Sequence, residues 1–319
     1  MLALEFGILG IPYDTAAGLG RPGARYAPAE VRRSLQWHLN RIRGKGVYDV
    51  EAGEVLDLDG VKVQDHGDVE VIGYDHGLML ERTEGPILGL LESGVIPVII
   101  GGDHSVSLPG LRALHSMTES AMGIIQMDAH LDLVDDSPVQ GRFSGSSEIR
   151  RALELDRVAP SNLIQVGVRG YNYPDQLDYI RRSGIRQIPA PEFRRVGAGA
   201  AAREALEVAA SGTDRLYLTL DIDVLDPAYA PGSGADEPGG LSSREVMEFV
   251  RLVAPRVSVI DIVEVNPMMD FRGMTSAVAA RIIMDFIVSV VRARKAGAGR
   301  TGRGCTGGRD GYDAQRGTQ

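Results

Sequence analysis

Cysteine, aromatic residues and long apolar runs are scarce in this sequence. Cys305 is the one cysteine among 319 residues, and aromatic side chains make up 5% of the chain. No disulfide can therefore form within the chain, which indicates a reducing, cytoplasmic environment. No uninterrupted apolar run reaches about 18 residues, and no basic segment precedes an apolar one at the N-terminus. Neither a membrane span nor a signal peptide is expected.

Basic residues are also fewer than acidic residues. Lysine and arginine number 34 against 43 acidic residues, and the resulting net charge of −9 argues against bulk nucleic-acid binding. With 44% hydrophobic residues, the chain can bury the core of one substantial domain, which we expect over residues 1–295. Residues 296–319 are rich in glycine and arginine without apolar periodicity, so a disordered tail is predicted there. An RNA-contacting segment is the alternative interpretation of the tail.

Strand-like and helical segments alternate along the chain. Strands are expected at 6–11, 95–100, 123–127, 163–168, 216–220 and 258–265. Helices are expected at 28–38, 76–93, 106–116, 174–183, 200–211, 242–253 and 275–293. This alternation predicts an α/β fold, a three-layer α/β/α sandwich with a mainly parallel sheet. Residues 48–72 are interpreted as surface hairpin-like connections, and Asp65, His66 and Asp68 receive no catalytic role.

The segment QMDAHLD at 126–132 follows an apolar run. Asp128, His130 and Asp132 occupy alternate positions, and alternate side chains of a strand share one face. They would emerge together at the carboxyl end of the strand, where open α/β sheets build their sites. This arrangement suits a hard divalent metal ion. A single triplet of this kind is equally compatible with helix caps or solvated turn residues.

Two further strand ends carry the same kind of residue. Asp221 and Asp223 follow the strand that ends in LTL, and His104 lies in GGDHS after the strand at 95–100. Asp103 or Ser105 would serve as a helix cap there if the segment were purely structural. Three strand ends that together offer two histidines and several carboxylates favour a site with more than one metal ion.

These motifs resemble the signatures of the ureohydrolases, the arginase and agmatinase family. The matching stretches are GGDHS at 101–105, DAHLD at 128–132, TLDIDVLDPAYAPGSG at 219–234, GIPYDTAAGLGRPGARYAPAEVR at 10–32 and DIVEVNP at 261–267. They occur in the expected order over about residues 5–295. The EPGGLSSRE and VEVNP stretches are closer to agmatinases and guanidinobutyrases than to arginases.

The resemblance implies an arginase-like fold with two Mn²⁺ ions per subunit. One ion would be held by His104, Asp128, Asp132 and Asp221, and the other by His130, Asp128, Asp221 and Asp223. Oxygen-rich ligation favours Mn²⁺ over Zn²⁺, whereas the two histidines are also compatible with Ni²⁺ or Co²⁺. Two such ions can activate a shared water for attack on a guanidinium carbon.

Two further roles follow from the resemblance. Glu264 matches the family position that hydrogen-bonds the substrate guanidinium, and a carboxylate is the natural bidentate partner of that group. A solvated strand-end glutamate is the alternative. Asp132 would also be catalytic, because its second oxygen is suited to carrying a proton to the leaving nitrogen.

One loop departs from the family pattern. Guanidinobutyrase-like members carry a loop resembling SHGTPFRRA, and the ungapped alignment places Gly145 at its histidine position. Formimidoylglutamases resemble this chain in lacking that histidine. Gly145, Ser146, Glu148 and Asp236 are therefore candidate substrate-binding residues, with Glu148 and Asp236 able to favour a cationic tail. Ordinary surface charge is the alternative for both carboxylates.

These features predict a hydrolase that releases urea from a small guanidine: an agmatine-like compound, a guanidino acid, or a substituted guanidine or biguanide. Formimidoylglutamase-type hydrolysis and a non-catalytic subunit of a ureohydrolase complex are the alternatives. A dinucleotide-binding dehydrogenase is a third, because Gly18–Gly23 fits GxGxxG. The resemblance also implies a homo-oligomer, a trimer or hexamer, with a hetero-oligomer as the variant; no nucleic-acid or membrane partner is expected.

Overall fold

A single parallel sheet organises the chain. The computed structural model describes residues 4–16, 21–136 and 139–301. Eight strands are hydrogen-bonded in the order β4-β1-β5-β10-β9-β6-β7-β8, and each neighbouring pair is parallel. Their bounds are β1 Leu4–Gly10, β4 Val61–Asp68, β5 Ile96–Ile100, β6 Met122–Met127, β7 Leu163–Val166, β8 Arg186–Ile188, β9 Arg215–Asp221 and β10 Val259–Val263.

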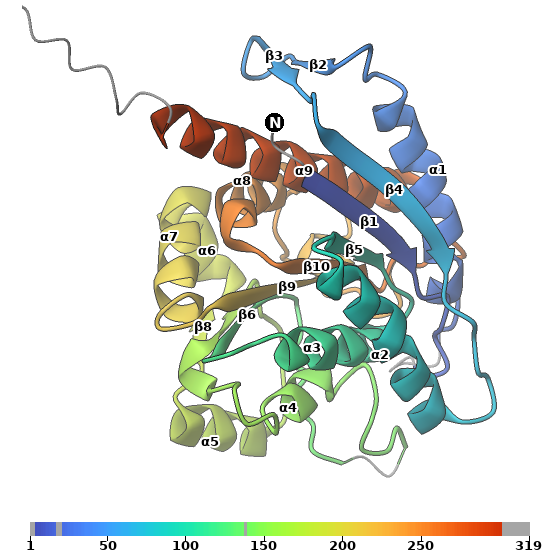
Figure 1. Ribbon diagram of the computed structural model, residues 1–319. Coiled ribbons are helices and arrows are strands. Elements are labelled where there is room, and N and C mark those ends of the chain that lie inside the picture. The colour runs from blue at the N-terminus through green and yellow to red at the C-terminus, as the bar shows by residue number, and fades with distance from the viewer. Residues whose placement is uncertain (1–3, 17–20, 137–138, 302–319) are drawn as a thin grey trace, which may run out of the picture.

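Helices cover both faces of this sheet (Figure 1). One face is packed against α1 Ala27–Leu39, α6 Ala190–Val196, α7 Ala198–Ala209, α8 Ser243–Val253 and α9 Met274–Thr301. The other is packed against α2 His76–Glu92, α3 Ser107–Ser116, α4 Glu148–Ala152 and α5 Pro174–Ser183. The predicted three-layer α/β/α sandwich with a mainly parallel sheet is confirmed.

Alternation along the strands sorts the apolar side chains into these two cores. In β6, Ile125 points to the α7 face and Ile124 to the α3 face, and both are fully buried. Strands buried on both faces read as nearly continuous apolar runs, which is why the six central strands were predictable. Local signals set the helix ends: Ser242 and Glu245 form a capping box at the start of α8.

Several elements were missed from the sequence. Residues 48–72 were interpreted as surface hairpin-like connections, and they do contain most of a hairpin of β2 Gly46–Asp49 and β3 Glu54–Asp57, but the edge strand β4 was not predicted. Most of β4 is exposed and polar, so it lacks the apolar pattern of a buried strand. Strand β8 and helices α4 and α6 are too short to show a period. Each forms because neighbouring elements pack against it.

One segment has the length and composition of a membrane helix, although the sequence contains no uninterrupted apolar run of about 18 residues. Residues Met274–Ala296 of α9 have the length and mean hydropathy, 1.8, of a membrane helix. However, 72% of the most apolar stretch is buried inside the protein, where α9 packs against α1 and α8. This burial is what the core helix of a domain requires. Helix α9 also extends past 296 to Thr301, and the rest of the predicted tail lies outside the described residues.

Candidate metal centre

Four neighbouring strands end at the same place. The carboxyl ends of β5, β10, β9 and β6 lie side by side in the sheet. Short 3₁₀ turns follow β5 and β9, and in the second the Asp221 carboxylate accepts a hydrogen bond from Asp223 N at 2.8 Å. At Gly102, an added Cβ would lie 1.8 Å from the carbonyl oxygen of Tyr13, so only glycine allows this approach. The sheet order therefore gathers segments as far apart in sequence as those of His104 and Glu264, which are separated by 160 residues.

His104 is the centre of a first cluster of side chains. Its Nδ1 lies 2.9 Å from Asp132 Oδ2, 3.2 Å from Asp128 Oδ2 and 3.3 Å from Asp221 Oδ2. All four side chains are buried. These are the four residues predicted for one metal ion.

His130 is the centre of a second cluster, which shares Asp128 with the first. His130 Nδ1 lies 2.9 Å from Asp223 Oδ2 and 3.6 Å from Asp128 Oδ1. Asp128 thus turns one oxygen to each histidine, the geometry of a bridging ligand. His104 Nδ1 and Asp223 Oδ2 are buried without a hydrogen-bond partner, so both are available as ligands.

The electrostatics of the two clusters favour bound cations. Burial and the neighbouring Asp128 raise the pKa of Asp132 to about 6, and burial with Asp223 and Asp128 raises the pKa of Asp221 well above its usual range. At Asp128 the shift has the opposite sign. Burial raises the pKa of this carboxyl, but His104 and His130 together lower it below its usual value. Carboxylates this crowded resist simultaneous ionisation unless positive charge is supplied. Two histidines and four carboxylates are a donor set that fits two divalent ions such as Mn²⁺.

Glu264 lies beside the first cluster, just after β10. Its Oε1 accepts a hydrogen bond from His104 N at 2.8 Å, and its own N–H donates to the carbonyl of Gly102 at 2.8 Å. Burial and the nearby Asp103 raise its pKa to about 8. Glu264 and Asp132 both have positive φ, 60° and 50°, a conformation that costs energy in non-glycine residues and is concentrated at functional sites.

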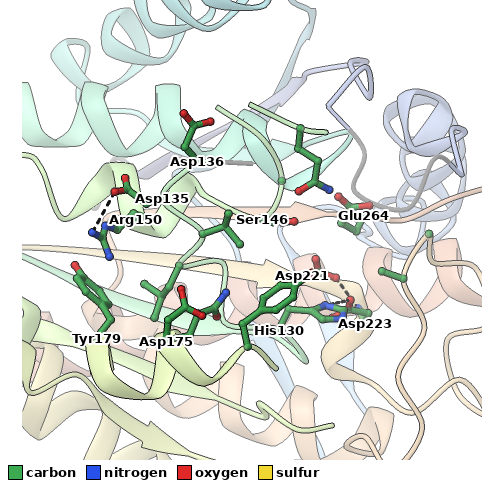
Figure 2. A pocket seen from close by; sticks show the side chains of 18 of the residues that line it. His130, Asp135, Asp136, Ser146, Arg150, Asp175, Tyr179, Asp221, Asp223 and Glu264 are labelled. Carbon is green, nitrogen blue, oxygen red and sulfur yellow. Dashed lines mark hydrogen bonds and ion pairs between the residues drawn. The ribbon is translucent and has the colours of Figure 1, made fainter. Parts of the chain in front are cut away.

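A cavity of about 740 Å³ opens onto these residues. Its inner part is lined by Glu264, His130, Asp221, Asp223 and Ser146 (Figure 2). Gly145, which precedes Ser146 in the loop that lacks histidine, also lines the cavity. The outer wall carries charges of both signs and two aromatic rings, none of them predicted. These wall residues are Asp135, Asp136, Arg150, Tyr173, Asp175, Tyr179 and Arg182; Arg21 also lines the cavity, beside Gly234.

Two predicted substrate contacts are not among the residues that line the cavity. Asp236 is half-buried, and burial raises its pKa. Glu148 is 1% exposed at the start of α4, with Oε1 3.6 Å from His104 Nε2. The surface-charge interpretation of Glu148 is therefore wrong. It failed because α4 was not predicted, and this helix directs the Glu148 side chain into the protein.

The GxGxxG match at Gly18–Gly23 does not form a phosphate cradle in its described part. The amide of Gly23 donates to Asp14 Oδ2 at 2.6 Å, so this donor is already occupied by a carboxylate. Asn266 also approaches Gly23 closely. Residues 18–20 lie outside the described residues. The arrangement offers no support for the dehydrogenase interpretation.

A polar row beneath the clusters was missed. Gln126, Gln165 and Gln187 lie side by side on β6, β7 and β8, and each precedes the last residue of its strand. A glutamine inside an apolar strand can be recognised in the sequence, and it predicts a buried hydrogen-bond partner because a buried amide needs one. The alignment of the three glutamines could not be predicted from the sequence, because it depends on how the strands pair.

Comparison with known proteins gives one consistent result. The profile of the Arginase family matches residues 4–289. The chain is 33% identical to the proclavaminate amidinohydrolase of Streptomyces clavuligerus, over 90% of this chain and 88% of that protein. It is 35% identical to the guanidinopropionase of Pseudomonas aeruginosa, covering 89% and 86%. The solved formimidoylglutamase of Bacillus subtilis superposes with a TM-score of 0.80 at 28% identity, covering 91% of this chain and 88% of that one.

Proposed function

This chain belongs to the arginase family, as its motifs predicted, and we propose that it is a metal-dependent amidinohydrolase that cleaves a C–N bond of a small guanidine compound. Water would add to the guanidinium carbon, and the products would be urea and an amine. The observation that carries the proposal is the pair of histidine–aspartate clusters joined through Asp128, with Glu264 at the same cavity.

Two metal ions are part of the proposal. His104, Asp128, Asp132 and Asp221 would hold one, and His130, Asp128, Asp221 and Asp223 the other. When bound, two divalent cations lower the pKa of a shared water and stabilise negative charge that develops during its attack. We propose Mn²⁺, with Ni²⁺ or Co²⁺ as the alternatives.

Two side chains would act on the substrate. Glu264 would bind the guanidinium through its carboxylate, because a planar cation with several N–H donors pairs best with two oxygens. The substrate's positive charge would also favour the ionised form of Glu264. Asp132 would take a proton from the attacking water and pass it to the leaving nitrogen, since its carboxylate lies within the first cluster, 2.9 Å from His104 Nδ1.

The outer wall of the cavity supports a substrate with a carboxylate tail. Arg150 lies at the other side of the cavity from the metal clusters (Figure 2). Its guanidinium stacks 3.7 Å from the centroid of Tyr179 and lies 3.5 Å from Asp135. Asp135 is shared with two further arginines, so Arg150 keeps charge that a carboxylate would neutralise. We therefore rank guanidino acids above agmatine.

Formimidoylglutamase-type hydrolysis is the second candidate function. The loop with Gly145 lacks the histidine of the guanidinobutyrase-type pattern, and a formimino compound would also present a cationic C–N centre to Glu264. A non-catalytic subunit is the third alternative, although the intact donor set argues against it. A trimer or hexamer is proposed from the family alone, and sedimentation analysis would test it.

The experiment is a screen of the purified protein loaded with Mn²⁺, Ni²⁺ or Co²⁺. Release of urea, formamide and ammonia would be measured on 3-guanidinopropionate, 4-guanidinobutyrate, agmatine, arginine, unsubstituted guanidine, a biguanide and formimidoylglutamate. Urea release from any guanidine supports the proposed reaction. Formamide release from the formimino compound, without urea from any guanidine, would replace it with the second candidate, and no product from any compound would favour the third.

The tail preference is tested with Arg150→Met. If Arg150 binds a carboxylate, KM for the guanidino acids should rise about 10- to 100-fold, the cost of one charge-assisted contact of about 1.5–3 kcal/mol, while kcat changes less. Turnover of agmatine, which has no carboxylate, should not fall. An equal loss on both kinds of substrate would assign Arg150 to the structure of the wall.

A further inference from the structure

A row of polar side chains crosses the sheet directly beneath the two clusters. Strand pairing aligns Gln187 with Gln165, Gln165 with Gln126, and Gln126 with Thr219. Neighbours in one register of a parallel sheet point to the same face, which here is the α3 face. Gln126, Gln165 and Thr219 are fully buried.

The three glutamines form one chain of hydrogen bonds. Gln187 Nε2 donates to Gln165 Oε1 at 2.7 Å, and Gln165 Nε2 donates to Gln126 Oε1 at 2.7 Å. Gln126 Nε2 then donates to Asp128 Oδ2 at 2.7 Å and contacts Asp132 Oδ2 at 3.5 Å. The chain therefore ends on two predicted metal ligands.

A backbone carbonyl fixes the direction of this chain. Gln165 Nε2 also donates to the carbonyl of Leu131 at 2.6 Å, and only the nitrogen of an amide can do this. Its oxygen must then face Gln187, and the oxygen of Gln126 must face Gln165. The N–H groups that link the row thus all donate in the direction of Asp128 and Asp132. Leu131 lies between His130 and Asp132, so the same bond holds the segment in which Asp132 has φ +50°.

Thr219 orients His104, as the glutamines orient the two carboxylates. Its hydroxyl lies 2.9 Å from His104 Nε2, while Nδ1 of the same ring faces the carboxylates without a hydrogen bond. Oγ1 as acceptor places the ring proton on Nε2 and leaves the Nδ1 lone pair free. A histidine that ligates a metal commonly donates its other N–H in this way.

We propose that Gln165, Gln126 and Thr219 are positioning residues that hold Asp128, Asp132 and His104 ready to bind metal. The row is unusual for a sheet core, because buried amides cost free energy unless every donor and acceptor is paired. An apolar row would fill such a space, as Met127, Val166 and Leu220 do in the next register, on the opposite face. The proposal rests on the metal centre of the proposed function.

Metal affinity tests the proposal independently of turnover. Protein stripped of metal would be titrated with Mn²⁺ by calorimetry, and its unfolding followed separately by differential scanning calorimetry. Gln165→Met removes both donors without changing the length of the side chain, and Thr219→Val is nearly isosteric. Both variants should bind Mn²⁺ about 10- to 100-fold more weakly, the usual cost of losing a partner of a metal ligand.

Ile164→Val is the matched control, because Ile164 is fully buried on the same strand as Gln165 but points to the opposite face. It should lower the unfolding temperature and leave Mn²⁺ affinity unchanged. Unchanged affinity in Thr219→Val and in folded Gln165→Met would overturn the inference; should Gln165→Met not fold, Thr219→Val decides alone. Wild-type protein that binds none of Mn²⁺, Ni²⁺ and Co²⁺ would instead contradict the proposed metal centre.

Discussion

At the scale of single residues, Asp128 joins the two predicted metal positions. Its oxygens lie 3.2 Å from His104 Nδ1 and 3.6 Å from His130 Nδ1. Asp128→Ala should therefore lose both metal ions, and Asp221→Ala should do the same, with activity at background. Asp223→Ala should lose only the ion at His130. Metal content by mass spectrometry checks this, and full metal content in Asp128→Ala would show that the ligand assignment is wrong.

Glu264 is predicted to act on the substrate and not on the metal ions. Glu264→Gln keeps the size of the side chain and the acceptor for His104 N but removes the charge that would bind the guanidinium. kcat/KM should fall about 10²- to 10³-fold, as when a key polar contact in a transition state is lost. Metal content and unfolding temperature should stay at wild-type values. Unchanged kcat/KM would leave Glu264 with a structural role only.

At the scale of elements, the segment from Ser144 to α4 distinguishes this chain from the guanidinobutyrase-type loop. A Cβ at Gly145 would lie 3.4 Å from Glu264 Oε1 and 3.5 Å from His104 N, ordinary contact distances, so a histidine side chain can start here. His76 lies on the outer side of the segment, bonded to Tyr13, and is not among the residues lining the cavity. Among the residues that the structure describes, none places an imidazole at the position where the guanidinobutyrase-type pattern predicts one.

Gly145→His should crowd the cavity beside Glu264. We expect unchanged metal content, a loss of about 10-fold or more on the best substrate through misplacement of the reacting carbon, and a gain of weak activity on agmatine or 4-guanidinobutyrate. Steady-state kinetics on the same compounds measure both changes. If the wild-type enzyme already turns over one of these two as fast as any compound tested, the loop does not mark an altered specificity.

At the scale of the whole molecule, metal binding and folding should be coupled through pH. In the metal-free protein the pKa is raised from 3.8 to about 6 at Asp132 and from 4.5 to about 8 at Glu264. The folded state then binds protons that the unfolded chain has released, so the stability of metal-free protein should fall as pH rises from about 4 to about 8. Divalent ions favour the ionised carboxylates and remove this loss.

Scanning calorimetry at pH 5.5 and pH 8 would measure the effect, with chelator-treated and Mn²⁺-loaded protein at each pH. The loaded protein should unfold at a higher temperature, and the difference should be larger at pH 8, where protons compete less for the ligands. At about 100 times Kd, one bound ion adds about 2.7 kcal/mol to the free energy of unfolding. Equal unfolding temperatures with and without Mn²⁺ at pH 8 would contradict the coupling.

The sequence alone determined the sandwich and the identity of the metal-ligand candidates. Buried strands are nearly continuous apolar runs, and carboxylates or histidines at their ends can be recognised in the sequence. The sequence could not align Gln126, Gln165 and Gln187, show that Glu148 is buried, or place Arg150 and Tyr179 on one wall. Strand order, register and the packing of α4 and α5 decided those, because each depends on contacts between segments far apart in the chain.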